Sequence, residues 1–126
     1  MAKAKIVPLV GEAAVRQALA GDADRLIVAT ATRYLLQVLG EAHPGNTVEV
    51  RVPPFGAIQC VEGPTHTRGT PPNVVETDPA TWIAVATGAT GWGEALASAR
   101  ITASGQRADL SGMLPVRWER EAQSAR

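Results

Sequence analysis

The first twenty residues repeat their apolar positions with the period of a helix. Positions three and four apart share one helix face. The apolar residues that fall near one side of segment 9–20 are Leu9, Val10, Ala14, Val15, Ala18 and Leu19. This spacing predicts an amphipathic helix, and Gly21 is expected to end it because glycine adopts the left-handed conformation at low cost.

A second helix is predicted from a capping Asp22 to about Gly40. One apolar stripe runs along it, formed by Ile27, Ala31, Tyr34, Leu35 and Val38. Leu36 and Leu39 widen the stripe, which predicts contacts on more than one side. The polar turn at 43–46 closes this helix pair, which occupies residues 9–40.

After residue 46 the apolar period changes from 3.6 to 2. Val48, Val50 and Val52 alternate with two charged residues, which is typical of a half-buried strand. Pro53-Pro54 is expected to end this strand. Segment 57–61 is predicted to be its partner, and 74–76 a third strand after the polar loop at 66–72.

The stretch from 73 to 114 contains the clearest helix start. Asp78 can accept a hydrogen bond from the first turn, and Pro79 at the first helical position removes no needed donor. Trp82, with apolar residues three and four places on, predicts a helix that ends at Gly88.

The pattern after Gly88 predicts four short elements. They are a helix at 92–99, a strand at 101–104, a helical turn capped by Asp109 that carries Leu110, Met113 and Leu114, and an edge strand at 115–116. Residues 117–126, including Trp118, are predicted to form a polar tail.

This order of elements is α-α-β-β-β-α-α-β-α, with a further strand at the end. It does not alternate strands and helices, and short links join the first strands. The pattern therefore predicts an α+β fold with an antiparallel sheet and helices on one face. We expect one domain over 1–126, made of the helix pair at 9–40, the sheet and helices at 46–116, and the tail.

Composition narrows the function classes. The 126 residues carry 12 basic and 12 acidic side chains, and the formal net charge of zero gives no electrostatic case for a nucleic-acid partner. The single Cys60 excludes an internal disulfide, which fits a reducing compartment. No apolar run approaches 18 residues, so no stable membrane insertion is expected. We therefore predict a cytoplasmic location.

One segment resembles a dinucleotide-binding turn. Thr87, Gly88 and Gly91 fit such a loop, but the third glycine is due at position 94, where the chain has Glu94. Too few residues follow to complete a doubly wound sheet. We expect a loop between helices, and no nucleotide binding.

No catalytic or metal-binding set is found. Cys60, His43 and His66 are scattered and lack the usual spacing of zinc ligands. The serines lie in no nucleophile turn, and Asp78 serves better as a cap than as a partner of Glu76. The sequence therefore predicts a non-enzymatic protein with no cofactor and no metal.

Two features leave a binding role open. Trp82 and Trp92 lie on successive short helices and can point into one volume, where they either fill the core or line an apolar cavity. Arg107 and Asp109 are expected to brace the turn before the last helix, and contact with a ligand head group is the alternative.

Several segments together are similar to a known family. They are DPATW at 78–82, ATG at 86–88, Trp92, and ITASGQRADLSGMLPV at 101–116, with RVPPFGAIQCVEG at 51–63 and HTRGTPPNVVETD at 66–78. Over about 25–116 this pattern resembles the sterol-carrier-protein superfamily, and within it the short actinobacterial branch of bacterial sterol-carrier orthologues.

The resemblance implies a mostly antiparallel sheet of about five strands, covered by helices, with an apolar tunnel for a fatty acyl chain or a sterol. Under this hypothesis the protein binds such a lipid without catalysis. Its oligomeric state is left open, with a homodimer as one alternative. The residues expected to line the cavity are Trp82, Ile83, Trp92, Leu96, Ile101, Leu110 and Met113. The alternative is an accessory or interaction module whose cavity is closed.

Overall fold

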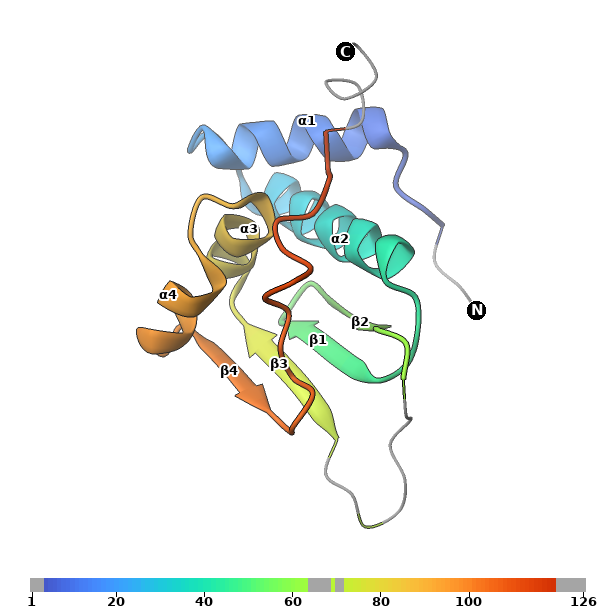
Figure 1. The fold of residues 1–126 in the computed structure, drawn as a ribbon. Helices are drawn as coiled ribbons and strands as arrows, with labels where there is room; N and C mark the ends of the chain where they lie inside the picture. Colours follow the sequence, from blue (N-terminus) through green and yellow to red (C-terminus); the bar gives the residue numbers. More distant parts are fainter. Residues whose placement is uncertain (1–3, 64–68, 70–71, 120–126) are drawn as a thin grey trace.

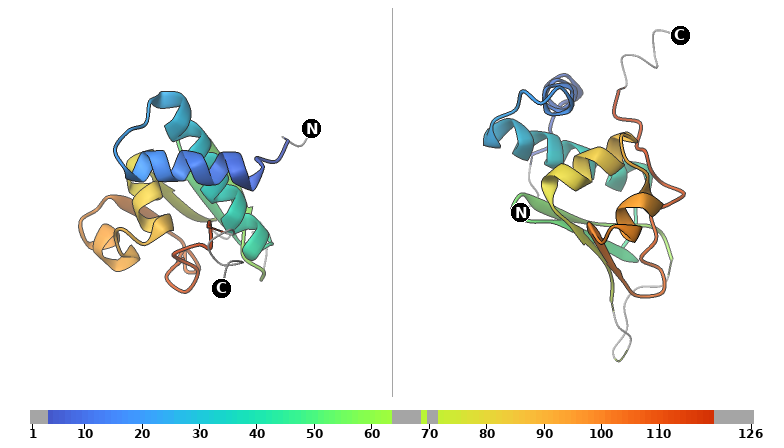
Figure 2. Two further views of the ribbon diagram at one scale, coloured as in Figure 1. Left: turned by 90° about the horizontal axis from the view of Figure 1, so that it is seen from above. Right: turned by 90° about the vertical axis from the view of Figure 1, so that its left-hand side faces the viewer.

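In the computed structural model, which describes residues 4–63, 69 and 72–119, the chain forms three layers (Figure 1). A sheet forms one layer, helices α2 and α3 cover one of its faces, and α1 lies outside them (Figure 2). The elements are α1 (Pro8–Leu19), α2 (Arg25–Ala42), β1 (Val48–Val52), β2 (Gly56–Cys60), β3 (Asn73–Thr77), α3 (Pro79–Thr87), α4 (Trp92–Ala97) and β4 (Ile101–Ser104). The predicted α+β class, with helices on one sheet face, is confirmed.

Helix α2 is the centre of the helical layer. Four residues of its predicted stripe, Ala31, Tyr34, Leu35 and Val38, are buried, and the fifth, Ile27, is partly buried against the core. Leu36 and Leu39 are buried as well, because α2 lies between α1 and the sheet and also packs against α3. The predicted cap is wrong: the helix starts two residues later, and Asp24, not Asp22, accepts the N–H of Ile27 at 2.9 Å.

Helix α1 buries less of its apolar side than its pattern predicts. Val15 is fully buried, but Leu9, Val10 and Leu19 are 74%, 53% and 44% exposed. The inward face includes Gly11, which lies directly against the Tyr34 ring of α2. Since α1 is an outer helix with neighbours on one side only, its remaining apolar residues face away from the core.

The described residues form a four-stranded mixed sheet in the order β2-β1-β3-β4, one strand fewer than the five or so expected. Two of its three strand pairs are antiparallel, as the prediction of a mostly antiparallel sheet requires, and one is parallel. Strand β1 pairs antiparallel with β2 but parallel with β3. The last residue of β2 and the first residue of β3 both face Val48. Strands β2 and β3, consecutive in the sequence, therefore lie on either side of β1 and run in opposite directions without pairing with each other.

The two faces of the sheet differ in polarity, as the period of two predicts. Val48, Val50 and Val52 point to the helices and are fully buried. On the other face Arg51 contacts Glu49 at 2.8 Å and Glu76 at 3.9 Å, and the hydrogen bond with Glu49, followed by the charges of both carboxylates, raises the pKa of Arg51. That face is left to solvent by the described part of the chain (Figure 2).

The predicted start and end of α3 are confirmed. The Asp78 carboxylate accepts the N–H of Thr81 at 3.2 Å, and Gly88 follows the helix with a φ of 87°. Burial alone would raise the pKa of Asp78, but hydrogen bonds from the Thr81 hydroxyl and from the N–H groups of Thr81, Asp78 and Ala80 outweigh it and lower this pKa. The cap is therefore strongest when Asp78 is ionised.

We expect Asp78→Ala to lower the free energy of unfolding by about 1 kcal/mol at pH 7, the usual size of a lost cap. Because the folded-state pKa is lowered, the ionised cap stabilises the protein above the unfolded pKa of about 3.9, and its contribution disappears as the pH falls through the folded value. Urea denaturation at pH 7 and below pH 4 measures this difference. Asp22→Ala is the control and should change stability little, since Asp22 is exposed and caps nothing in the structure. Equal effects of the two substitutions would contradict the assignment.

The segment after β4 departs most from prediction. Residues 105–119 contain no helix and no strand, so the predicted edge strand at 115–116 is wrong. The predicted helical turn is present only as a single hydrogen-bonded turn, in which the Met113 N–H donates to the Leu110 carbonyl at 2.9 Å. Asp109 accepts the N–H of Ser111 at 2.9 Å at the start of this turn. Hydrogen bonds from the N–H and from the hydroxyl of Ser111 lower the pKa of Asp109. The N–H of Val116 bonds to the carbonyl of Ala86 in α3 at 2.9 Å, so the chain is held by a helix end where a strand was expected.

Trp118 is buried and not part of a polar tail. It is 8% exposed and belongs to the main core cluster. The segment that carries it runs past α3 towards α1 (Figure 1), where Arg16 lies 3.7 Å from Glu119. Residues 120–126 of the tail predicted at 117–126, and most of the loop predicted at 66–72, lie outside the described residues.

Candidate functional site

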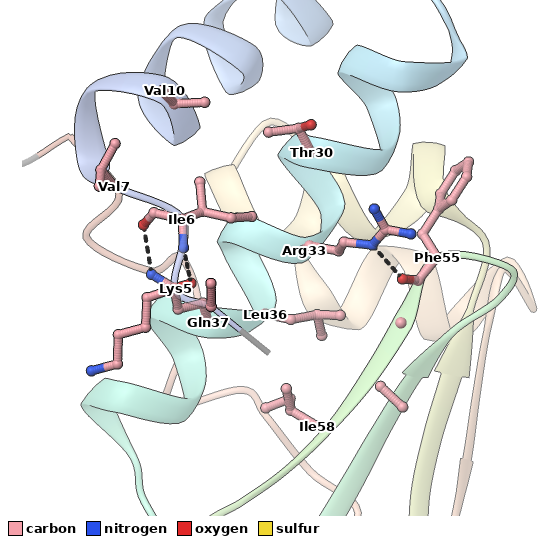
Figure 3. Close-up of a pocket in the computed structure, with 13 residues that line it drawn as sticks. Lys5, Ile6, Val7, Val10, Thr30, Arg33, Leu36, Gln37, Phe55 and Ile58 are labelled. Carbon is pink, nitrogen blue, oxygen red and sulfur yellow. Dashed lines mark hydrogen bonds between the residues drawn. The ribbon is translucent and has the colours of Figure 1, made fainter. Parts of the chain in front are cut away.

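A groove of about 900 Å³ lies between α2, the start of α1 and the hairpin of β1 and β2 (Figure 3). Most of its lining is apolar. The lining residues are Ala4, Lys5, Ile6, Val7, Val10, Thr30, Arg33, Leu36, Gln37, Phe55, Gly56, Ala57 and Ile58. The groove thus combines three segments that are distant in the sequence.

Its apolar wall follows from the two-sided apolar pattern of α2. Leu36 extends from α2 towards the hairpin, and Ile58 faces it from the edge strand β2 (Figure 3). Ile6 and Val10 line the side formed by the start of α1. These are aliphatic side chains without polar atoms, so this part of the groove suits a hydrocarbon chain.

The Gln37 side chain holds in place the wall of the groove that is formed by the segment before α1. The Gln37 amide accepts the N–H of Ile6 at 2.9 Å and donates to the Ile6 carbonyl at 2.9 Å (Figure 3). An amide has a donor and an acceptor side by side, so it binds the extended segment before α1 as a neighbouring strand would. Lys5 adds an ion pair with Glu41 at 3.1 Å. The wall is held by α2 without any strand pairing.

The other end of the groove is polar. Arg33 donates from Nε to the carbonyl of Phe55 at 2.8 Å (Figure 3). The guanidinium carbons of Arg25 and Arg33 lie 5.0 and 5.9 Å from the centroid of the Phe55 ring, within the range of cation–π contacts. In Figure 3 Arg33 and Phe55 lie on one side of the apolar wall and Lys5 on the other.

The seven residues predicted to line a cavity lie elsewhere, around α3, α4 and β4. Trp82, Ile83, Ile101 and Leu110 belong to one buried cluster, and Trp92 and Met113 pack against it. Leu96 is 36% exposed on α4. The structure thus brings six of the seven together in the core and at its rim, and their role in ligand binding stays a prediction.

Two of these residues have distinct surroundings. Trp82 donates its indole N–H to the carbonyl of Thr32 in α2 at 3.2 Å, which ties α3 to α2. Met113 lines a second pocket of about 510 Å³, beside Val38 and His43. None of the seven lines the groove at Arg33.

Sequence reasoning missed the groove, although one signal was available. Arg33 and Gln37 are four residues apart and share one side of α2 with Leu36 near them, so an apolar side chain flanked by two hydrogen-bonding ones could have marked a binding face. The roles of Ile6 and Phe55 had no local signal, because only folding brings them to this face.

The alternatives weighed for other chemistry find little support. The segment that resembled a nucleotide-binding strand and turn is helix α3 followed by its left-handed glycine.

Burial raises the pKa of the Cys60 thiol to about 11, so it is neutral and unreactive at pH 7. His66 lies outside the described residues, within which no group of three His, Cys, Asp or Glu side chains could hold a metal ion. Asp109 supports the turn through its side chain, whereas Arg107 contributes only its backbone N–H, which donates to the Asn73 side-chain oxygen at 2.9 Å. The contact of these two residues with a ligand head group stays a prediction.

Comparison with known protein families shows the family to which this chain belongs. The sequence model of the family described as bacterial SCP ortholog, where SCP denotes sterol carrier protein, matches residues 24–116, which is more than half of the chain. The chain belongs to this family. No curated protein matches the chain.

Membership in the bacterial SCP orthologs is consistent with a capacity to bind lipids. The matched region begins at the cap of α2 and ends at Val116, so α1 lies before it. The groove is therefore built from both parts, with α2 and the hairpin inside the matched region and Ile6 and Val10 before it. The finer assignment to the actinobacterial branch stays a prediction. Within the described residues, no helix is both long and apolar enough to cross a membrane.

Proposed function

We propose that this protein binds a single-chain apolar ligand, a fatty acyl chain or a similar lipid, in the groove between α2 and the β1–β2 hairpin, and that it does so without catalysis. The groove itself carries the proposal. Its volume of about 900 Å³ lies within the range of roughly 300–1,000 Å³ found for ligand pockets, and its mostly apolar lining with a few polar groups is the usual composition of such sites. Membership in the bacterial SCP orthologs supports the same class of ligand.

The lining also supports a non-catalytic role. It contains no histidine, cysteine, serine or carboxylate, and acid–base or nucleophilic catalysis needs such groups within reach of a substrate. The one lysine in it is paired with Glu41. We therefore propose a binding protein with no cofactor or metal. We also propose that it acts in the cytoplasm, without a nucleic-acid partner and without stable insertion into a membrane.

The seven residues around Trp82 and Trp92 are retained as a second proposed location for the ligand. Their buried members would have to move apart to admit a chain, because the cluster is closed in the structure. Trp92 and Met113 at its rim are partly exposed, so a chain would enter beside them. The groove is favoured because it is already open.

The test is a series of fatty acids of increasing length. Each buried CH₂ contributes about 0.8 kcal/mol, less the cost of ordering the chain, so affinity should rise with length until the groove is full. Val10→Asn should weaken the best ligand about tenfold, close to the value of one buried Val side chain. Calorimetry or displacement of a fluorescent fatty acid measures both effects.

Two variants serve as controls. Leu9→Asn lies next to Val10 in α1 but outside the lining, and should leave affinity unchanged. Trp92→Ala should also have no effect if the groove is the site, and should weaken binding if the second location is correct. If no fatty acid of any length binds the wild-type protein, the proposed function is wrong.

A second function is favoured by the free edge of the sheet. In the described part of the chain β2 pairs only with β1, and an open strand edge can accept a strand from another chain. This observation supports an accessory or interaction module, with a homodimer formed through β2 as its simplest case. Sedimentation of wild-type protein and of Ala57→Pro, which removes a backbone donor from β2, distinguishes this function. A dimer that the substitution dissociates, together with no lipid binding, would favour it.

A further inference from the structure

Two arginine side chains converge on the Phe55 ring at the polar end of the groove. Arg33 and Phe55 line the groove, and Arg25 lies outside the lining, against the ring. The guanidinium carbons of Arg25 and Arg33 lie 5.0 and 5.9 Å from the centre of the Phe55 ring. Arg25 is the first residue of α2 and Arg33 follows about two turns later. Both residues are exposed, so both positive charges are accessible from solvent.

Neither charge is neutralised by the described part of the chain. The printed sequence places Asp24 beside Arg25, but its carboxylate caps α2 by accepting the Ile27 N–H at 2.9 Å, and no carboxylate among the described residues lies within 4.0 Å of either guanidinium. By contrast, Lys5 at the other end of the groove is paired. Arg25 also lies at the positive end of the α2 dipole, where a cation is unfavourable and an anion is stabilised.

The orientation of Arg33 is fixed for binding. Its Nε donates to the Phe55 carbonyl at 2.8 Å, and its Nη groups have no hydrogen-bond partner within the described residues. A guanidinium presents a planar fork that matches the oxygens of a phosphate or carboxylate, and holding it in place beforehand lowers the entropy lost on binding. Both guanidiniums lie over the Phe55 ring, which packs against them.

We infer that Arg25 and Arg33 form a binding site for a phosphate group, the head group of a single-chain amphiphile whose hydrocarbon chain lies along Leu36 and Ile58. This inference rests on the proposed function for the chain and adds the class of head group. A phosphomonoester carries up to two negative charges at neutral pH and three acceptor oxygens, which matches two cations better than the single charge of a carboxylate. An uncharged alcohol leaves both arginines without a counter-ion.

The experiment compares four ligands by calorimetry at pH 8 and low salt: decyl phosphate, decanoate, decanol and inorganic phosphate. The three alkyl ligands share one chain length, so differences among them report the head group. Decyl phosphate should bind at least about tenfold more tightly than decanol, with decanoate between them, and added salt should reduce this difference. Inorganic phosphate should bind much more weakly, since it lacks the chain.

Substitutions then locate the head group. Arg25→Gln should weaken decyl phosphate about five- to tenfold, the effect of one lost charge-assisted hydrogen bond, and should change decanol less than about twofold. Arg107→Gln is the matched control. It removes the same charge at an exposed position after β4, on the opposite edge of the sheet from β2, and should affect neither ligand. Circular dichroism confirms that each variant is folded.

The possible outcomes separate the two proposals. If decyl phosphate and decanol bind equally well and Arg25→Gln changes neither, the head-group site is wrong while the apolar groove stands. If inorganic phosphate binds as tightly as decyl phosphate, the arginines serve a free anion and the lipid head-group assignment is overturned. If no alkyl ligand binds, the proposed function itself is wrong.

Discussion

Gly11→Ala is expected to destabilise the protein by at least about 3 kcal/mol, at the upper end of the usual cost of overpacking. A Cβ atom at this position would overlap the Tyr34 ring. That ring is fully buried in α2, so it has no free space into which to move. Alanine favours a helix over glycine by about 1 kcal/mol, so a large loss of stability would report the contact between α1 and α2 and not the local preference. Chemical denaturation measures it.

Gly93→Ala is the matched control. Gly93 also lies within a helix, but a Cβ atom there would meet nothing within 4 Å, so this substitution should stabilise the protein slightly. A double substitution tests the contact directly. Gly11→Ala combined with Tyr34→Ala should cost less than the two single losses together, because alanine at position 34 lacks the ring atoms that the new methyl group would meet. Additive losses would mean that the two residues do not meet.

Trp118→Ala is expected to lower the free energy of unfolding by about 3–5 kcal/mol, the range for removing a buried aromatic side chain. Trp118 is 8% exposed and lies in the main core cluster. The segment around it is held to α3 by the bond from Val116 to Ala86 and to α1 by the contact of Arg16 with Glu119. Loss of the side chain should therefore loosen both helices. Thermal and urea unfolding followed by circular dichroism provide the measurement.

Trp92→Ala is the comparison for this prediction. Trp92 is only partly buried at the start of α4, so its removal should cost clearly less than that of Trp118. Trp118→Phe should fall between the wild type and Trp118→Ala, since part of the apolar surface is kept. A stability loss below about 1 kcal/mol for Trp118→Ala would be typical of an exposed tail, and would contradict the burial seen in the structure.

Local signals in the sequence were enough to predict most elements. The cap at Asp78, the glycine after α3 and the alternating valines of β1 each depend on a few neighbouring residues, and all three appear as expected. The same signals were ambiguous where several candidates were close together. Asp22 and Asp24 are equally good caps by type, and only the packing of α2 decides which one begins the helix.

The sequence by itself determined the α+β class, the helices on one sheet face, and the similarity to sterol carrier proteins, because periodicity and motifs are local properties. Tertiary structure alone decided that β3 pairs with β1, that Trp118 is buried, and that Ile6, Arg33 and Phe55 meet at one groove. The physical reason is that these contacts join segments separated by many residues, and their energy depends on the whole arrangement of neighbours. A hydrophobic pattern shows that a side chain is to be buried, but it does not show which distant surface will cover it.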